Sequence, residues 1–317
     1  VLDTDKAPSD TVAASLAAFK RAIRDPAGDP EELIDGEVKK LRNFLLKWPL
    51  ISRDATDSGV WQDALIELLG VADTLMRLVV TGIVNDRARS HDELWFKVIT
   101  RLMSRIPRDP GFQSYDKQWT HLTLLPAFML LKAASHAAIT VDREELFIRL
   151  HIRPQLPTAK ESLERYLNMR SVSAVRILYD VHMLEAEAGR AALSLTSERW
   201  VSTVVRRWVE PALLACVDDD RASFEKLADR VEFRATLLHQ FVLPDWSERN
   251  HSFASGLHTL DHFDRTGRWI VSDDFVDEDK IGIWVEELEL ESREYMLERI
   301  ERFQIRAEQF IHRYHSH

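Results

Sequence analysis

Residues 122–139 read LTLLPAFMLLKAASHAAI and form the longest nearly unbroken apolar stretch of the chain. Lys132, Ser135 and His136 interrupt this stretch, whereas a membrane-spanning helix needs about 18 or more residues with few or no charges. The stretch therefore predicts a helix buried within a helical protein, and we expect no membrane association.

Amphipathic helices are expected on both sides of this stretch, because apolar residues recur at helical spacing along most of the chain. Proline and glycine end the helices, as in the segment DPAGDP at residues 25–30. The fold class is all-α, an irregular helical array or bundle of about ten to twelve helices without a fixed repeat period. The expected helices span 10–24, 31–48, 60–84, 91–106, 119–139, 142–151, 159–169, 171–188, 197–216, 219–241 and 286–314.

The helical pattern breaks into shorter pieces after Pro244. Within these pieces, WIV at 269–271 and IGIW at 281–284 predict a small β-hairpin near residues 269–284. We expect a main helical domain at residues 1–243 and a C-terminal acidic segment at residues 256–317 that ends in a long helix.

Negative charge is concentrated near the C-terminus. Residues 273–301 hold twelve acidic residues against Lys280, Arg293 and Arg299, a net charge of −9 out of −10 for the whole chain. Such a surface repels phosphates, so we expect no nucleic-acid partner on that face. A plain solvated helix face is the alternative to a specialised end of the molecule.

The composition excludes several classes of site. The chain has 10 Gly, and it contains neither G-x-G-x-x-G, nor a Walker loop, nor G-x-S-x-G, so we expect no cofactor bound through such loops. The single Cys216 cannot form an internal disulfide, and no basic-then-apolar leader is present, so a cytoplasmic setting is expected. The chain begins at Val1 rather than Met, so we expect it to be part of a longer polypeptide.

Two clusters have residue types that bind metals. Asp273, Asp274 and Asp277 spell DDxxD, by which all-helical prenyl-transfer enzymes hold magnesium, but no second metal motif accompanies it. His258 and His262 have zinc-protease spacing, yet Thr259 stands where the general-base Glu is needed. Helix capping or packing is the alternative for both, and we predict no metal ligands and no catalytic residues.

Arg followed by His after four to six residues, as in helical HEPN ribonucleases, occurs at Arg176–His182, Arg234–His239 and Arg306–His312. Chance predicts roughly three or four such matches, so these pairs carry little weight.

Two stretches have a more specific pattern. The first comprises LWFKVITRL at 94–102, Tyr115, Trp119, LPAFMLLKAA at 125–134 and REEL at 143–146; the second comprises DDR at 219–221 and FEKLADRVEF at 224–233. Together they resemble the helical C-terminal region of bacterial antiphage defence proteins, which follows sirtuin-like or TIR NADases, nucleases or STAND-type ATPases. Leu125-Pro126 stands where that family tends to have Tyr-Pro, and Ser135-His136 where it has Gly. The aromatic residues are equally compatible with a plain core.

The C-terminal helix has an apolar seam with alternating steps of four and three residues, formed by Met296, Ile300, Phe303, Ala307, Phe310 and Tyr314. Opposite it lies an acidic face of Glu291, Glu294, Glu298 and Glu301. The seam packs either on this chain's own body or on a partner, with the acidic face steering a basic protein. The candidate interaction residues are Met296, Ile300, Phe303, Phe310, Glu298 and Glu301.

The resemblance implies a non-catalytic sensor or regulatory module of a bacterial defence system, which recognises a trigger protein or restrains an effector domain. Its partners would be proteins, with a homo-oligomer as an option. Two other functions stay open: an all-helical enzyme, metal-dependent through the DDxxD run or HEPN-like, and a structural scaffold.

Overall fold

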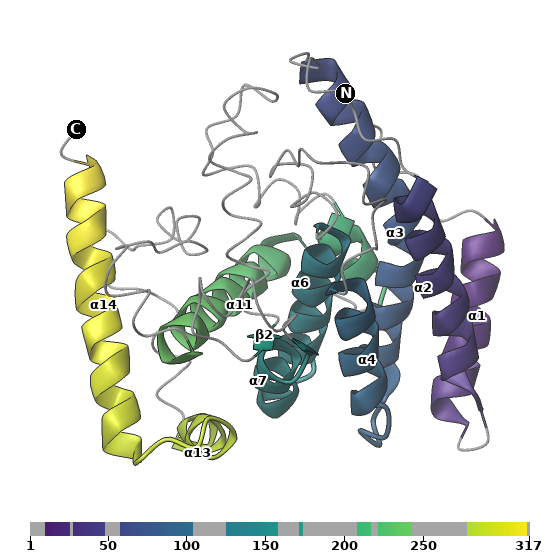
Figure 1. The fold of residues 1–317 in the computed structure, drawn as a ribbon. Helices are drawn as coiled ribbons and strands as arrows, with labels where there is room; N and C mark the ends of the chain where they lie inside the picture. The colour runs from purple at the N-terminus through teal and green to yellow at the C-terminus, as the bar shows by residue number, and fades with distance from the viewer. Residues whose placement is uncertain are drawn as a thin grey trace.

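The computed structural model describes residues 10–25, 28–47, 58–103, 125–157, 171–173, 208–216, 221–242 and 278–315 (Figure 1). The described part is all-α, as predicted, apart from one short antiparallel ribbon. Its helices are α1 (Asp10–Arg24), α2 (Pro30–Lys47), α3 (Ser58–Asn85), α4 (Asp92–Met103), α6 (Leu125–Thr140), α7 (Glu144–Ile152), α11 (Arg221–Val242), α13 (Glu278–Glu287) and α14 (Arg293–His315), and residues 208–214 are also helical.

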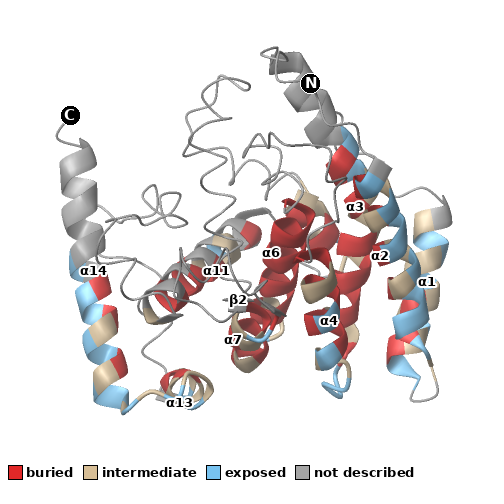
Figure 2. Cartoon of the chain, in the orientation of Figure 1, coloured by how far each residue is buried: buried red, intermediate tan, exposed pale blue. Residues whose placement is uncertain are grey.

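Helix α6 is the buried centre predicted from its sequence. Every residue from Leu125 to Ile139 is buried, and α6 packs against α3, α4, α7 and α11 (Figures 1 and 2). Its polar side chains are accommodated locally. The Ser135 hydroxyl donates to the Leu131 carbonyl at 2.7 Å, and His136 Nδ1 lies 2.7 Å from the Lys132 carbonyl, which can only accept. In the parts of the chain that the structure covers, no helix has the length and apolarity to cross a bilayer.

Close packing between α1, α3 and α4 depends on a glycine. Trp95 of α4 is buried and meets Phe19 of α1 edge to face, with ring centroids 6.4 Å apart. Gly82 of α3 makes room for this indole, because a Cβ added at Gly82 would lie 2.2 Å from the Trp95 ring. The N-terminal helices α1 to α4 are thereby joined into one core.

The predicted hairpin near 269–284 is wrong in its second half, because Ile281 to Trp284 lie in α13. Ile281 and Trp284 are both buried on one helix face, since residues three apart share a face. The short run IGIW did not reveal this helical spacing by itself. Residues 269–271 lie outside the described residues.

The terminal helix begins later than predicted. Helix α13 ends at Glu287, and α14 begins at Arg293. Glu289 has a φ of 52°, and the Leu290 N–H donates to the Val285 carbonyl at 3.0 Å, which is the hydrogen bond of a Schellman C-cap. Ser292 then caps α14, because the Tyr295 N–H donates to its hydroxyl oxygen at 3.2 Å.

A two-stranded antiparallel ribbon joins β1 (Gln155–Pro157) and β2 (Ser171–Ser173), with Leu156 opposite Val172. Residues 171–173 were expected to begin a helix, and the ribbon replaces its first turn. The ribbon lies beside α4.

Candidate functional site

Three helices meet at one buried carboxylate. Glu144, in the first turn of α7, accepts two hydrogen bonds at its Oε1 atom. Arg234 Nε of α11 donates at 2.7 Å, and Trp284 Nε1 of α13 donates at 2.8 Å. Glu144 is 3% exposed, and the other two residues are fully buried. One oxygen atom therefore links the centre of the chain to two helices from its C-terminal half. We call Glu144, Arg234 and Trp284 the buried triad.

Aromatic rings enclose the buried triad. The Trp284 ring lies 6.4 Å from Phe147 of α7 and 6.3 Å from Phe241 of α11, measured between centroids. Arg234 Nη1 also donates to the Arg230 carbonyl at 3.3 Å. A charged pair in such surroundings gives up its hydration, and removing one partner exposes the other to that full cost. The arrangement suits holding helices in place, because the carboxylate oxygen already accepts two donors.

Ion pairs on the rim of the same contact tie α13 to the body. Arg149 of α7 donates to both carboxylate oxygens of Glu287, from Nε at 2.9 Å and from Nη2. The hydrogen bond with Glu287 raises the pKa of Arg149 above its ordinary value, against the lowering effect of burial. Lys280 of α13 lies 3.5 Å from Asp142. These pairs and the buried triad together fix how α13 lies on α7, and α14 in turn contacts α13.

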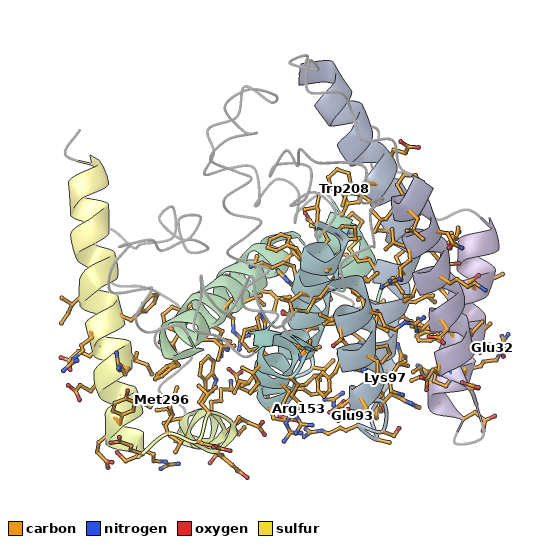
Figure 3. The ribbon with its side chains drawn as sticks, viewed as in Figure 1. Glu32, Glu93, Lys97, Arg153, Trp208 and Met296 are labelled. Carbon is orange, nitrogen blue, oxygen red and sulfur yellow. The ribbon has the colours of Figure 1, made fainter. Side chains whose placement is uncertain are left out.

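A groove of about 800 Å³ opens elsewhere, between α2, α4 and the end of α7. Figure 3 labels Glu93, Lys97 and Arg153 of its lining. The groove is lined by Glu31, Glu93, Phe96, Lys97, Thr100, Arg101, Ile152 and Arg153. Each of its cations is paired with a carboxylate of a neighbouring helix: Lys97 with Glu31 at 3.1 Å, Arg153 with Glu93 at 3.1 Å, and Arg101 with Asp35. The Arg153 guanidinium lies 5.6 Å from the centroid of the Phe96 ring. The groove thus has an apolar floor and a charged rim.

The candidate interaction residues of α14 divide between two faces. Met296, Ile300 and Phe303 are buried within this chain, and the Phe303 ring meets Phe233 of α11 edge to face at 5.6 Å. The first half of the seam therefore packs on the chain's own body in this structure. Glu298 and Glu301 are exposed on the outer side. The side chain of Phe310 lies outside the described residues.

The structure describes few residues of the metal-binding and Arg–His motifs. Asp273, Asp274, Asp277, His258 and His262 lie outside the described residues. Where the structure describes the chain, no group of three or more His, Cys, Asp or Glu side chains could hold a metal ion. Arg234 of the Arg234–His239 match is held by Glu144 in the buried triad.

Sequence reasoning missed Glu144 and Trp284 entirely. Glu144 stands in an ordinary acidic first turn, EE at 144–145, and no local pattern distinguishes the buried carboxylate from the partly exposed one beside it. The sequence Phe233-Arg234 followed by two leucines at 237 and 238 was the one usable signal, because an arginine within an apolar face indicates burial with a partner.

Comparisons with family models, curated proteins and solved structures gave no significant match to this chain.

We predict that magnesium or zinc leaves the melting temperature essentially unchanged, because neither the Asp273 cluster nor the His258/His262 pair completes a ligand set. Differential scanning fluorimetry with each metal at sub-millimolar concentration measures this. A rise of several degrees that disappears in Asp274→Ala or His262→Ala would contradict the prediction, since a ligand specific to the folded state raises its stability.

Proposed function

We propose that this chain is a non-catalytic regulatory or protein-interaction module of a bacterial antiviral defence system. It recognises a trigger protein or restrains an effector domain. The resemblance of residues 94–146 and 219–233 to helical regions of antiphage proteins motivates the biological setting.

The observation that carries the proposal is the attachment of α13 and α14 through the buried triad. A partner that pulls on α14 acts on α13, and α13 hydrogen-bonds through Trp284 to the same oxygen that holds Arg234 of α11. Displacement of α13 would remove a donor from the buried carboxylate that also holds Arg234 of α11. This shared acceptor supports a module in which a partner that binds α14 alters the packing around Glu144.

The acidic outer face of α14 supports a protein partner. Glu294, Glu298 and Glu301 are exposed together with Leu297, which is 47% exposed. Hydrogen bonds from its own backbone N–H and from the Ser292 hydroxyl lower the pKa of Glu294 below its ordinary value. The carboxylates on this face favour association with a basic surface.

We predict that the isolated chain does not turn over NAD, ATP or RNA. The reason is that its sequence has no phosphate-binding glycine loop and its Arg–His pairs occur at the frequency of chance. Product formation is measured with purified protein by chromatography for the nucleotides and by gel for RNA. Turnover that one substitution in this chain abolishes would favour the enzyme alternative instead.

The defence function is tested by plaque assay. Cells that express the natural reading frame encoding this chain are challenged with a phage panel, and the efficiency of plating is compared with that of an empty vector. The proposal expects at least one phage to be restricted, and it expects Glu144→Leu to abolish restriction. Normal plating of every phage on cells with confirmed expression contradicts a defence role.

A further inference from the structure

We propose that the outer face of α14 docks into the groove between α2, α4 and α7 of a second copy of this chain, giving a head-to-tail assembly. The inference rests on the proposed role of α14 as an interaction element, and it names the partner. The contact would pair charges and apolar side chains that already lie at matching intervals on two helices.

One face of α4 lines the groove. Glu93, Phe96, Lys97, Thr100 and Arg101 all belong to the lining, and their spacing of three and four residues puts them on one side of the helix. The charges on this face run from negative at Glu93 to positive at Lys97 and Arg101. Four residues of helix advance about 6 Å, so the charges repeat at that interval.

The outer face of α14 also runs from negative to positive along the chain. Glu294, Glu298 and Arg302 are exposed and also four residues apart. In an antiparallel alignment, Arg302 meets Glu93, Glu298 meets Lys97, and Glu294 meets Arg101. A parallel alignment would place Glu294 beside Glu93 instead. The charge order therefore selects the antiparallel direction.

One apolar side chain of α14 lies among these charges. Leu297 is 47% exposed and lies on the face of α14 that carries Glu298 and Glu301. Leu297 is flanked by acidic residues just as the apolar floor of the groove, Phe96 and Ile152, is flanked by cations. Glu301, one turn beyond Leu297, is then placed to reach Arg153 across the groove.

The ion pairs that occupy the groove in a single copy do not prevent docking. Lys97 and Glu31 are 58% and 52% exposed, and Arg153 and Glu93 are 49% and 73% exposed. Exposed pairs of this kind contribute little to stability, so their cations can turn to the carboxylates of α14. Arg302 pairs with Glu298 on its own helix in a single copy. On docking, Arg302 exchanges this partner for Glu93 of the second copy.

The two surfaces cannot meet within one copy. Helix α14 runs along one edge of the molecule, whereas Glu93, Lys97 and Arg153 lie on the far side of α13 and α7 (Figures 1 and 3). The contact joins two different patches, so it is heterologous, and repeated copies either close into a ring or extend into a filament.

The test uses sedimentation velocity of the purified chain over a concentration series at low and at high salt. We expect the weight-average sedimentation coefficient to rise with concentration at low salt, and the rise to disappear at high salt because the charges are screened. The α14 variant Glu298→Lys/Glu301→Lys and the groove variant Lys97→Glu/Arg153→Glu should each weaken association at least about tenfold.

Mixing the two variants separates this contact from any other. Each variant repels itself, but a mixture presents opposite charges at both contacts, so association should return in the equimolar mixture. Glu67→Lys/Glu286→Lys and Lys39→Glu/Lys40→Glu reverse exposed charges elsewhere and should associate like the unmodified chain. Circular dichroism is used to check that all variants are folded.

Three results would overturn the proposal: an unmodified chain that stays monomeric at low salt, association that neither variant weakens, or a mixture of folded variants that fails to associate. A monomeric chain whose reading frame still restricts phage would reject self-assembly and leave the proposed defence function intact. If every phage plated normally while the chain assembled in a salt-sensitive way and the mixed variants associated again, the defence function would be rejected and self-assembly would stand.

Discussion

Replacement of Glu144 by leucine is expected to lower the free energy of unfolding by about 3–5 kcal/mol. The change removes the carboxylate from a fully buried guanidinium, Arg234, and from the indole N–H of Trp284. A charge kept from water cannot recover this interaction from solvent. Urea denaturation followed by circular dichroism measures the loss.

The double variant Glu144→Leu/Arg234→Leu is the matched control. It removes both charges, and the principal remaining cost is the Trp284 N–H without its acceptor, about 1–3 kcal/mol. The double variant should therefore be more stable than Glu144→Leu alone. A double variant at least as unstable as the sum of the two single variants would show that the pair contributes no coupling.

Phe303→Asp is expected to destabilise the chain by at least about 3 kcal/mol, the usual cost of removing a buried phenylalanine ring. Phe303 is 3% exposed and packs on Phe233 of α11, so the substitution also places a carboxylate against an aromatic ring. The effect should appear in the monomer, as a lower urea midpoint at a concentration where no association occurs.

Ile305→Asp controls for the loss of an apolar side chain from the same helix. Ile305 is 46% exposed, and its substitution should change stability by less than about 0.5 kcal/mol. If Phe303→Asp were equally harmless, the contact between Phe303 and Phe233 would contribute nothing to the folded monomer. The inner face of α14 would then be available to a partner instead.

Helix positions were largely predictable, because most helices bury one stripe and repeat it at a constant interval. The stretch LPAFMLLKAASHAAI at 125–139 predicted a buried helix, and α6 is buried along all of it. The pattern failed where a helix is short. Residues 281–284 show only one turn of α13, and a single turn cannot distinguish a helical period from a strand.

The buried triad was not predictable, because its members are 90 and 140 positions apart in sequence. Glu144 and Glu145 are identical in type and adjacent, and only packing by α11 and α13 decides which one loses contact with water. Arg234 was the exception, since its apolar neighbours indicated burial. The groove was equally hidden, because its lining comes from α2, α4 and α7, and a sequence read one helix at a time does not bring them together.

The separation of 140 residues between Glu144 and Trp284 also has a consequence for synthesis on the ribosome. At about 5–20 residues per second, Trp284 is made roughly 7 to 30 seconds after Glu144. During that interval, the N-terminal end of α7 has a carboxylate whose indole donor does not yet exist. Arg234 can pair with this carboxylate once α11 has emerged, so the step that waits for α13 is the covering of the Glu144–Arg234 pair by the Trp284 indole.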